Sequence, residues 1–340
     1  MTISRGGASV MRVAIEKFPL KKPFRITGYT MVDADVVTVE LEKDGHIGRG
    51  EASGVYYRQF DDVASSVRQI EAVRPRLEVG IDRESLRRLL PLGGARNAVD
   101  CALWDLEAKL TGRAAWQIAG LNRLQPLLTT FTVGANNPDQ MAADARAYTR
   151  AKAIKLKLTG QPADADRVRA VRDVLPDVWL GVDANQGFSR SSLEALLPVL
   201  VEARVELIEQ PFKIGEDAQL DGLSSPIPLA ADESVQGLAD LPGLVGRFNV
   251  VNIKLDKCGG LTEALVMARE ARRLGLGVMV GNMIGTSLAM APSFLVGQLC
   301  NVVDLDGPMF LSTDRDLPVR YENGMITCPE ALWGAPEPAP

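Results

Sequence analysis

Three carboxylates close three successive apolar runs in the second half of the chain. Asp183, Glu209 and Asp232 are 26 and 23 residues apart, with Lys157 lying 26 residues before them and Lys254 22 residues after them. Each step is about the length of one strand–helix unit, so we expect these side chains at one height on adjacent parallel strands. Converging carboxylates repel one another, and a hard divalent cation relieves that repulsion. The spacing therefore predicts a metal site for Mg²⁺, with Mn²⁺ as an alternative.

Two lysines are expected to flank this site. Residues 153–158 read Ala-Ile-Lys-Leu-Lys-Leu, so Lys155 and Lys157 share one face of a strand, while Lys254 ends a strand on the far side of the ring. A cation bound to a carboxylate stabilises the enolate formed when the neighbouring proton is removed. A lysine base must be neutral, which burial, a second lysine and the cation all favour. Lysines on both faces predict racemisation or epimerisation, whereas a single active lysine would allow elimination.

Two further carboxylates lie on the last expected strand. In Val303-Asp304-Leu305-Asp306, Asp304 and Asp306 share one face, which we expect to point into the barrel. They lie too far round the ring to bind the same metal. We therefore expect them to bind a cationic group on the substrate.

The elements needed to position these residues follow a βα pattern. Helical patterns separate the expected strands, which are residues 128–134, 153–158, 178–183, 205–209, 227–231, 249–254, 277–281 and 302–306. This indicates a parallel α/β barrel, because the competing doubly wound sheet would carry a GxGxxG after an early strand. Before the barrel, residues 9–52 read as strands and residues 60–119 as helices, which predicts a small α+β domain.

The composition excludes several function classes. The chain has 340 residues and one histidine, His46, in an expected hairpin turn, so a catalytic triad or a histidine zinc site is disfavoured. Four widely spaced cysteines predict neither a metal site nor a disulfide scaffold and favour the cytoplasm. The net charge of −5 gives no basic surface for nucleic acid. No apolar run predicts a membrane span or a signal peptide.

Taken together, the motifs resemble a known family. The enolase superfamily, and within it the muconate-lactonizing subgroup, has sequences similar to Lys155-x-Lys157, Asp183-Ala-Asn185, Glu209-Gln-Pro211, Asp232-Glu-Ser234 and Asn252-Ile-Lys254. The likeness spans nearly the whole chain, including Ala95 to Asp105. In addition, Asp304-Leu-Asp306 resembles the DxD motif of the dipeptide epimerases.

This resemblance implies a fold and a set of roles. The fold would be a (β/α)7β modified TIM barrel (residues 126–311) with an α+β capping domain (residues 1–125, completed by about 312–340). The implied site has Mg²⁺ on the three carboxylates and a dipeptide as its small-molecule partner. The roles implied for the other residues are acid/base catalysis by Lys157 and Lys254, electrostatic support of Lys157 by Lys155, and binding of the dipeptide's α-ammonium group by Asp304 and Asp306. The resemblance also suggests a homo-oligomer.

The expected reaction inverts the α-carbon of the C-terminal residue of an L,L-dipeptide such as L-Ala-L-Glu. We expect the side chain of that residue to meet Arg25 or Arg58 in the capping loops, and the pocket to be lined by Met283 and Ile284.

Three alternatives stay open. A cycloisomerase or an o-succinylbenzoate synthase-like lyase would use the same barrel, but its substrate has no ammonium group for Asp304 and Asp306. A Schiff-base aldolase would also use inward lysines, but would not need three carboxylates. A catalytically silent binding protein is disfavoured, because no expected ligand or base is missing.

Overall fold

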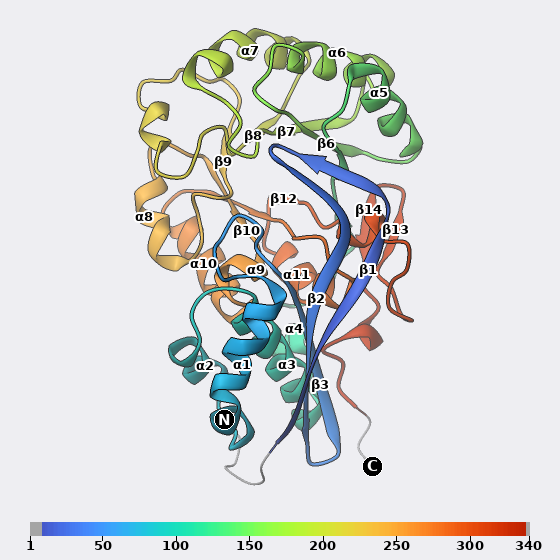
Figure 1. The fold of residues 1–340 in the computed structure, drawn as a ribbon, viewed down its shortest axis with the longest axis vertical. Helices are drawn as coiled ribbons and strands as arrows, with labels where there is room; N and C mark the ends of the chain where they lie inside the picture. The colour runs from blue at the N-terminus through green and yellow to red at the C-terminus, as the bar shows by residue number, and fades with distance from the viewer. Residues whose placement is uncertain (1–8, 338–340) are drawn as a thin grey trace.

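Eight parallel strands form one sheet, in sequence order, in the computed structural model, which describes residues 9–337 (Figure 1). The sheet closes into a barrel where the backbone N of Thr130 donates to Val303 O at 3.0 Å. The predicted α/β barrel is thereby confirmed. Its strands are β5 (Phe131–Val133), β6 (Ala153–Lys157), β7 (Trp179–Asp183), β8 (Leu207–Glu209), β9 (Leu229–Ala231), β10 (Val250–Ile253), β11 (Gly277–Val280) and β12 (Val302–Val303).

Helices cover the outside of this barrel and bury the apolar face of each strand. Ile154 and Leu156 of β6, for example, are fully buried within the main hydrophobic core. The longer helices are α5 (Pro138–Ala147), α6 (Asp164–Val174), α7 (Arg190–Glu202), α10 (Leu261–Arg273) and α11 (Ser287–Gly297).

The connections from β8 to β9 and from β9 to β10 differ from the expected strand–helix alternation, because they contain only short helices. The connection from β8 to β9 has one 3₁₀ turn, and Pro226 and Pro228 near its end lack the N–H groups that a longer helix would need. The short helices of the barrel are η1 (Asp217–Leu220), η2 (Leu238–Asp240), α8 (Leu241–Leu244), α9 (Leu255–Cys258) and η3 (Gly307–Phe310).

The N-terminal part combines an antiparallel sheet with helices, as predicted. Its strands pair in the order β1–β2–β3, and α3 packs against β2 and β3 through a separate core that includes Val37, Val39 and Val99. The elements are β1 (Val10–Ile26), β2 (Tyr29–Lys43), β3 (His46–Ser53), α1 (Val63–Glu78), α2 (Arg83–Leu89), α3 (Gly94–Thr111) and α4 (Ala115–Ile118).

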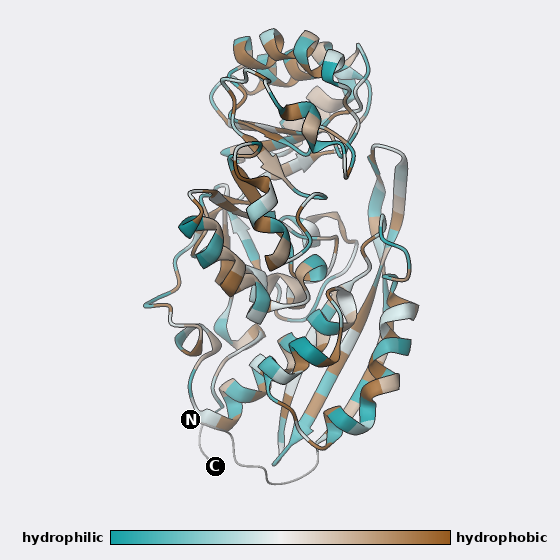
Figure 2. Ribbon diagram, turned by 90° about the vertical axis from the view of Figure 1, so that its left-hand side faces the viewer, coloured by the Kyte–Doolittle hydropathy of each residue, from teal (hydrophilic) through white to brown (hydrophobic). Residues whose placement is uncertain are grey.

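The hairpin of β1 and β2 extends from this region to the barrel (Figure 2). At its tip, Thr27 Oγ1 lies 3.0 Å from the carbonyl oxygens of both Leu158 and Ala184, which follow β6 and β7. Beside it, Ala135 N donates to Arg25 O at 3.1 Å. The hairpin therefore covers the carboxyl ends of the strands that carry the predicted site.

The C-terminal segment packs back onto the N-terminal part. Arg315 forms ion pairs with Glu16 and Glu51, and Trp333 Nε1 donates to Arg49 O at 2.8 Å. A third sheet joins β4 (Leu127–Leu128), β13 (Arg320–Glu322) and β14 (Met325–Thr327), and η4 (Glu330–Leu332) follows it. The domain boundaries stay a prediction, and residues 1–8 and 338–340 of the expected capping domain lie outside the described residues. Within residues 9–337, no helix combines the length and apolar character of a membrane span.

Candidate active site

The predicted site residues meet at the carboxyl ends of the barrel strands. Lys157 pairs with Asp183 in the register of β6 and β7, and Asp183 pairs with Glu209 in that of β7 and β8. Glu209 then pairs with Ala230, so Asp232 lies two residues beyond the level of its neighbour. The expectation of one height therefore holds for Lys157, Asp183 and Glu209 only. Asp232 lies two residues beyond that level and Lys254 a further two beyond Asp232, offsets that follow the stagger of barrel strands.

The three carboxylates form a compact, buried group. Asp183, Glu209 and Asp232 are each at most 1% exposed, and one oxygen from each lies within 4.8 Å of the others. Burial and the charge of Asp183 raise the pKa of Glu209 to about 7. Burial acts in the same direction on Asp232, but the ammonium groups of Lys254 and Lys257 outweigh it and lower the pKa of Asp232. Three buried oxygen ligands at this spacing are a donor set that fits a hard divalent cation.

The two candidate acid/base lysines bind different carboxylates of this group. Lys157 Nζ lies 2.5 Å from Asp183 Oδ2, and Lys254 Nζ lies 2.6 Å from Asp232 Oδ2. Burial acts to lower the pKa of Lys254, but the charges of Asp232 and Glu209 outweigh it and raise that pKa well above its usual value. The ion pair with Asp232 therefore favours the ammonium form of Lys254.

Lys155 connects the carboxylate group to the DxD motif. Its Nζ lies 2.5 Å from Asp304 Oδ2 and 3.2 Å from Glu209 Oε2. Thr130 Oγ1 donates to the other oxygen of Asp304. The carboxylate of Asp304 is therefore already paired with a cation within the protein.

Asp306 differs from Asp304 in its partners. Its Oδ2 accepts a hydrogen bond of 2.6 Å from the backbone N of Thr132, and no ammonium or guanidinium group among residues 9–337 forms an ion pair with it. Burial and the charge of Asp304 raise the pKa of Asp306 to about 7. Of the two motif residues, Asp306 has the carboxylate that lacks a cationic partner within the described part of the chain.

Of the two arginines expected to meet the substrate side chain, Arg25 lies at an open groove. It is exposed on β1 and lines a groove of about 230 Å³ together with Phe24, Thr132, Tyr148 and Phe310, among others. Among residues 9–337, no hydrogen bond or ion pair engages its guanidinium group. Arg25 is therefore available to a ligand at this groove.

Arg58, in contrast, is held by the protein itself. Its Nη1 lies 3.1 Å from both Asp61 Oδ2 and Lys257 O, and its Nη2 donates to Leu92 O at 3.1 Å. These partners occupy both terminal nitrogens, so the guanidinium group already has three acceptors within the protein. The preceding Tyr57 faces the site instead: its hydroxyl accepts a hydrogen bond from Gln236 Nε2, and burial and the charge of Asp232 raise its pKa.

The expected pocket residues Met283 and Ile284 lie in the loop between β11 and α11. Met283 is 8% exposed, and Ile284 packs against the apolar cluster that includes Phe24 and Leu311. Ser53 Oγ donates to Ile284 O at 2.8 Å, which ties this loop to β3. The loop therefore sits between the barrel and the N-terminal sheet.

Three residues that the sequence reasoning did not assign also shape the site. Asn252 Nδ2 donates to Glu209 Oε1, and Gln210 Oε1 accepts from the backbone N of Asp232. Lys257 Nζ lies 2.5 Å from Asp232 Oδ1. Parity predicts that Asn252 faces inward together with Lys254 but gives it no partner, whereas Lys257 follows the strand in a helical turn, where parity gives no signal.

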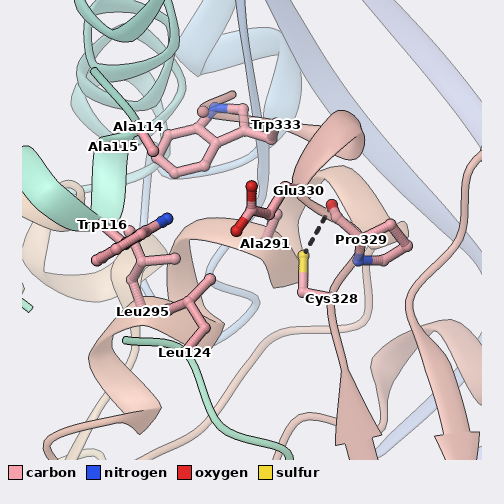
Figure 3. Close-up of a pocket in the computed structure, with 11 residues that line it drawn as sticks. Ala114, Ala115, Trp116, Leu124, Ala291, Leu295, Cys328, Pro329, Glu330 and Trp333 are labelled. Carbon is pink, nitrogen blue, oxygen red and sulfur yellow. Dashed lines mark hydrogen bonds between the residues drawn. The ribbon is translucent and has the colours of Figure 1, made fainter. Parts of the chain in front are cut away.

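Figure 3 shows a second, smaller cavity, between α4, α11 and the segment after β14. Its lining is mainly apolar and includes Trp116, Glu330 and Trp333. With a volume of about 10 Å³ it has room for about one water molecule. None of the candidate site residues lines it, so the carboxylate group is the stronger candidate for a catalytic site.

Comparison with known proteins identifies the family of this chain. Residues 140–333 match the family model described as enolase C-terminal domain-like, and residues 9–120 match the mandelate racemase/muconate lactonizing enzyme N-terminal domain. The L-Ala-D/L-Glu epimerase of Escherichia coli K12 is 40% identical over 318 residues, which cover 93% of this chain and 98% of that protein.

Two solved structures share the whole fold. An enolase family member from Agrobacterium tumefaciens, described as homologous to dipeptide epimerases and bound to sodium and L-Ala-L-Glu, superposes with a TM-score of 0.93 at 41% identity, covering 96% of this chain and all of that one. The dipeptide epimerase of Methylococcus capsulatus, in complex with Mg and L-Arg-D-Lys, gives a TM-score of 0.89 at 30% identity, covering 96% and 99%. The chain therefore belongs to the mandelate racemase and muconate-lactonizing enzyme family of the enolase superfamily.

Proposed function

We propose that this protein is a Mg²⁺-dependent dipeptide epimerase that inverts the α-carbon of the C-terminal residue of an L,L-dipeptide such as L-Ala-L-Glu. The observation that carries the proposal is the placement of Lys157 and Lys254. They belong to β6 and to the end of β10, four strands apart in the barrel, and each binds a different member of the buried carboxylate group. This arrangement supports proton transfer on opposite faces of one substrate carbon.

The substrate would be held at both of its charged ends. Asp306, whose carboxylate has no cationic partner among residues 9–337, would bind the α-ammonium group, with Asp304, held by Lys155, beside it. Asp183, Glu209 and Asp232 would hold Mg²⁺. The ion supplies electrostatic stabilisation of the charge that develops on the substrate carboxylate when the α-proton leaves.

The chain's own residues would perform the proton transfers. The Nζ of one lysine, in its neutral form, takes the α-proton, and the ammonium Nζ of the other donates a proton to the opposite face. The same steps in reverse return the starting epimer. Lys155, which lies 3.8 Å from the Asp183 oxygen that Lys157 also binds, would add positive charge beside Lys157.

The substrate side chain would lie between the hairpin of β1 and β2 and the loop after β11. Arg25, at its open groove, would meet an acidic side chain, and Met283 and Ile284 would line the apolar part.

We further propose a cytoplasmic homo-oligomer. Four free cysteines support the reducing compartment, and light scattering would measure the oligomeric state.

A screen of L,L-dipeptides with Mg²⁺ in D₂O tests the proposal. We expect the L,D product, with deuterium at the α-carbon of the C-terminal residue. Release of a leaving group would instead indicate the lyase alternative. Trapping of a lysine adduct by borohydride would indicate an aldolase, and either result would overturn the proposal.

A further inference from the structure

The three carboxylates of the site share a pattern of partners. One oxygen of each faces a lysine of the barrel mouth, and the other oxygen is bound by a second donor. For Asp183 that donor is the backbone N of Asn185 at 2.8 Å, and for Glu209 it is Asn252 Nδ2 at 2.7 Å. Both of these donors are neutral and belong to the barrel framework, so each fixes the direction in which its carboxylate presents the other oxygen.

Asp232 follows the same pattern, but its second donor is a lysine. Lys254 faces Oδ2, and Lys257 Nζ lies 2.5 Å from Oδ1. Lys257 also donates to Asp232 O at 2.5 Å and to Asn252 O at 3.1 Å. An ammonium group has three hydrogens, so these three oxygens use all of its donors.

Lys257 is also closed off from any reactant. It is 1% exposed, whereas Lys254 is 6% exposed and binds a single oxygen among the described residues. Lys257 lies about one turn after Lys254, in α9. From there its Nζ reaches the carbonyl oxygens at the ends of β9 and β10. Lys257 is therefore placed to hold Asp232 in one orientation and not to exchange a proton with a substrate.

We propose that Lys257 is a positioning residue that fixes the orientation of Asp232, so that Oδ2 is presented to the metal site and to Lys254. This rests on the proposed Mg²⁺ site. Lys257 would do for Asp232 what the amide donors of Asn185 and Asn252 do for the other two carboxylates, and it would also join the ends of β9 and β10 by binding a carbonyl oxygen of each. Donors behind metal ligands are typically worth about 10- to 100-fold in metal affinity.

Titration calorimetry of the substrate-free enzyme with Mg²⁺ tests this inference in Lys257→Met. Positioning predicts that the Kd for Mg²⁺ rises about 10- to 100-fold. A mere charge effect predicts the opposite, because removal of an ammonium group next to a cation site reduces repulsion and tightens binding. A Kd that is unchanged or lower would overturn the inference.

Two further variants make the result specific. Lys109→Met is the matched control, because Lys109 also binds a carboxylate and a backbone carbonyl but lies on α3. Its Kd for Mg²⁺ should equal that of the parent enzyme, and an equal rise in both variants would contradict a positioning role. If Lys257→Met does not fold, Lys257→Gln takes its place: its amide has two hydrogens for the three oxygens that Lys257 binds, so we expect a smaller rise in the Kd for Mg²⁺, and an unchanged or lower Kd would overturn the inference. Absence of Mg²⁺ binding in the parent enzyme would refute the proposed function itself, independently of Lys257.

Discussion

Lys155 binds Asp304 across the closure of the barrel, with 2.5 Å between Nζ and Oδ2. The two residues are 149 positions apart in the sequence, and they become neighbours only because β12 closes against the start of β5. In the DxD motif, Asp304 is therefore paired with the ammonium group of Lys155. Asp306 has no cationic partner among residues 9–337, so its carboxylate is available to a cationic group of a ligand.

Asp306→Asn should therefore weaken substrate binding more than turnover. Loss of a hydrogen bond to a charged group costs about 1.5–3 kcal/mol, so we expect KM for the dipeptide to rise roughly 10- to 100-fold with a smaller change in kcat. Steady-state kinetics at saturating Mg²⁺ measure this. An unchanged KM would remove the assigned role of Asp306.

Asp306 should also make kcat/KM depend on pH. The pKa of Asp306 is raised to about 7, so its carboxyl group gains a proton and loses its charge as the pH falls below that value. We expect kcat/KM of the parent enzyme to decline on the acid side of about pH 7 through this ionisation. In Asp306→Asn, which is uncharged at every pH, this contribution should be absent; an identical acid limb in both enzymes would assign it to another group.

Removal of divalent cations provides a separate test. Dialysis against a chelator should abolish epimerisation, and added Mg²⁺ should restore it, because the buried group of Asp183, Glu209 and Asp232 then regains its cation. Asp183→Asn should not be restored at the Mg²⁺ concentration that saturates the parent enzyme. Full turnover in the chelated parent enzyme would argue for metal-free chemistry such as a Schiff base.

Arg58 should matter for stability more than for catalysis. Its guanidinium group joins Asp61 to two backbone carbonyls, and buried acceptors left without a donor cost about 1–3 kcal/mol. We expect Arg58→Met to lower the free energy of unfolding by an amount in that range. The control is Arg12→Met, whose exposed ion pairs contribute less than about 1 kcal/mol. Equal denaturation midpoints for the two variants would contradict the structural role.

His46 should be dispensable for catalysis. It starts β3, next to the turn at Asp44 and Gly45, and its ring pairs with Glu337 at the surface. Exposed pairs of this kind contribute about 1 kcal/mol or less. His46→Ala should keep the kcat and KM of the parent enzyme, and a large loss of kcat would return histidine to the mechanism.

The sequence predicted the barrel and the central carboxylates because both depend on a repeating local unit. Strands recur at nearly constant spacing and alternate their faces, so Lys157, Asp183 and Glu209 could be placed by counting alone. Which side chains bind one another does not follow from strand spacing or from the alternation of faces. That Arg58 is held by Asp61, and that Lys257 lies behind Asp232, depends on loops and a single helical turn whose directions are set by tertiary packing.

The most direct test of the two-base mechanism is α-proton exchange in D₂O, followed by NMR, in Lys157→Ala and Lys254→Ala. Each variant keeps one lysine and therefore one face of the substrate carbon. We predict that neither variant interconverts the L,L and L,D epimers, and that each exchanges the α-proton of only one of them, with opposite preferences. Interconversion of the epimers at the parent rate by either variant would contradict the central claim.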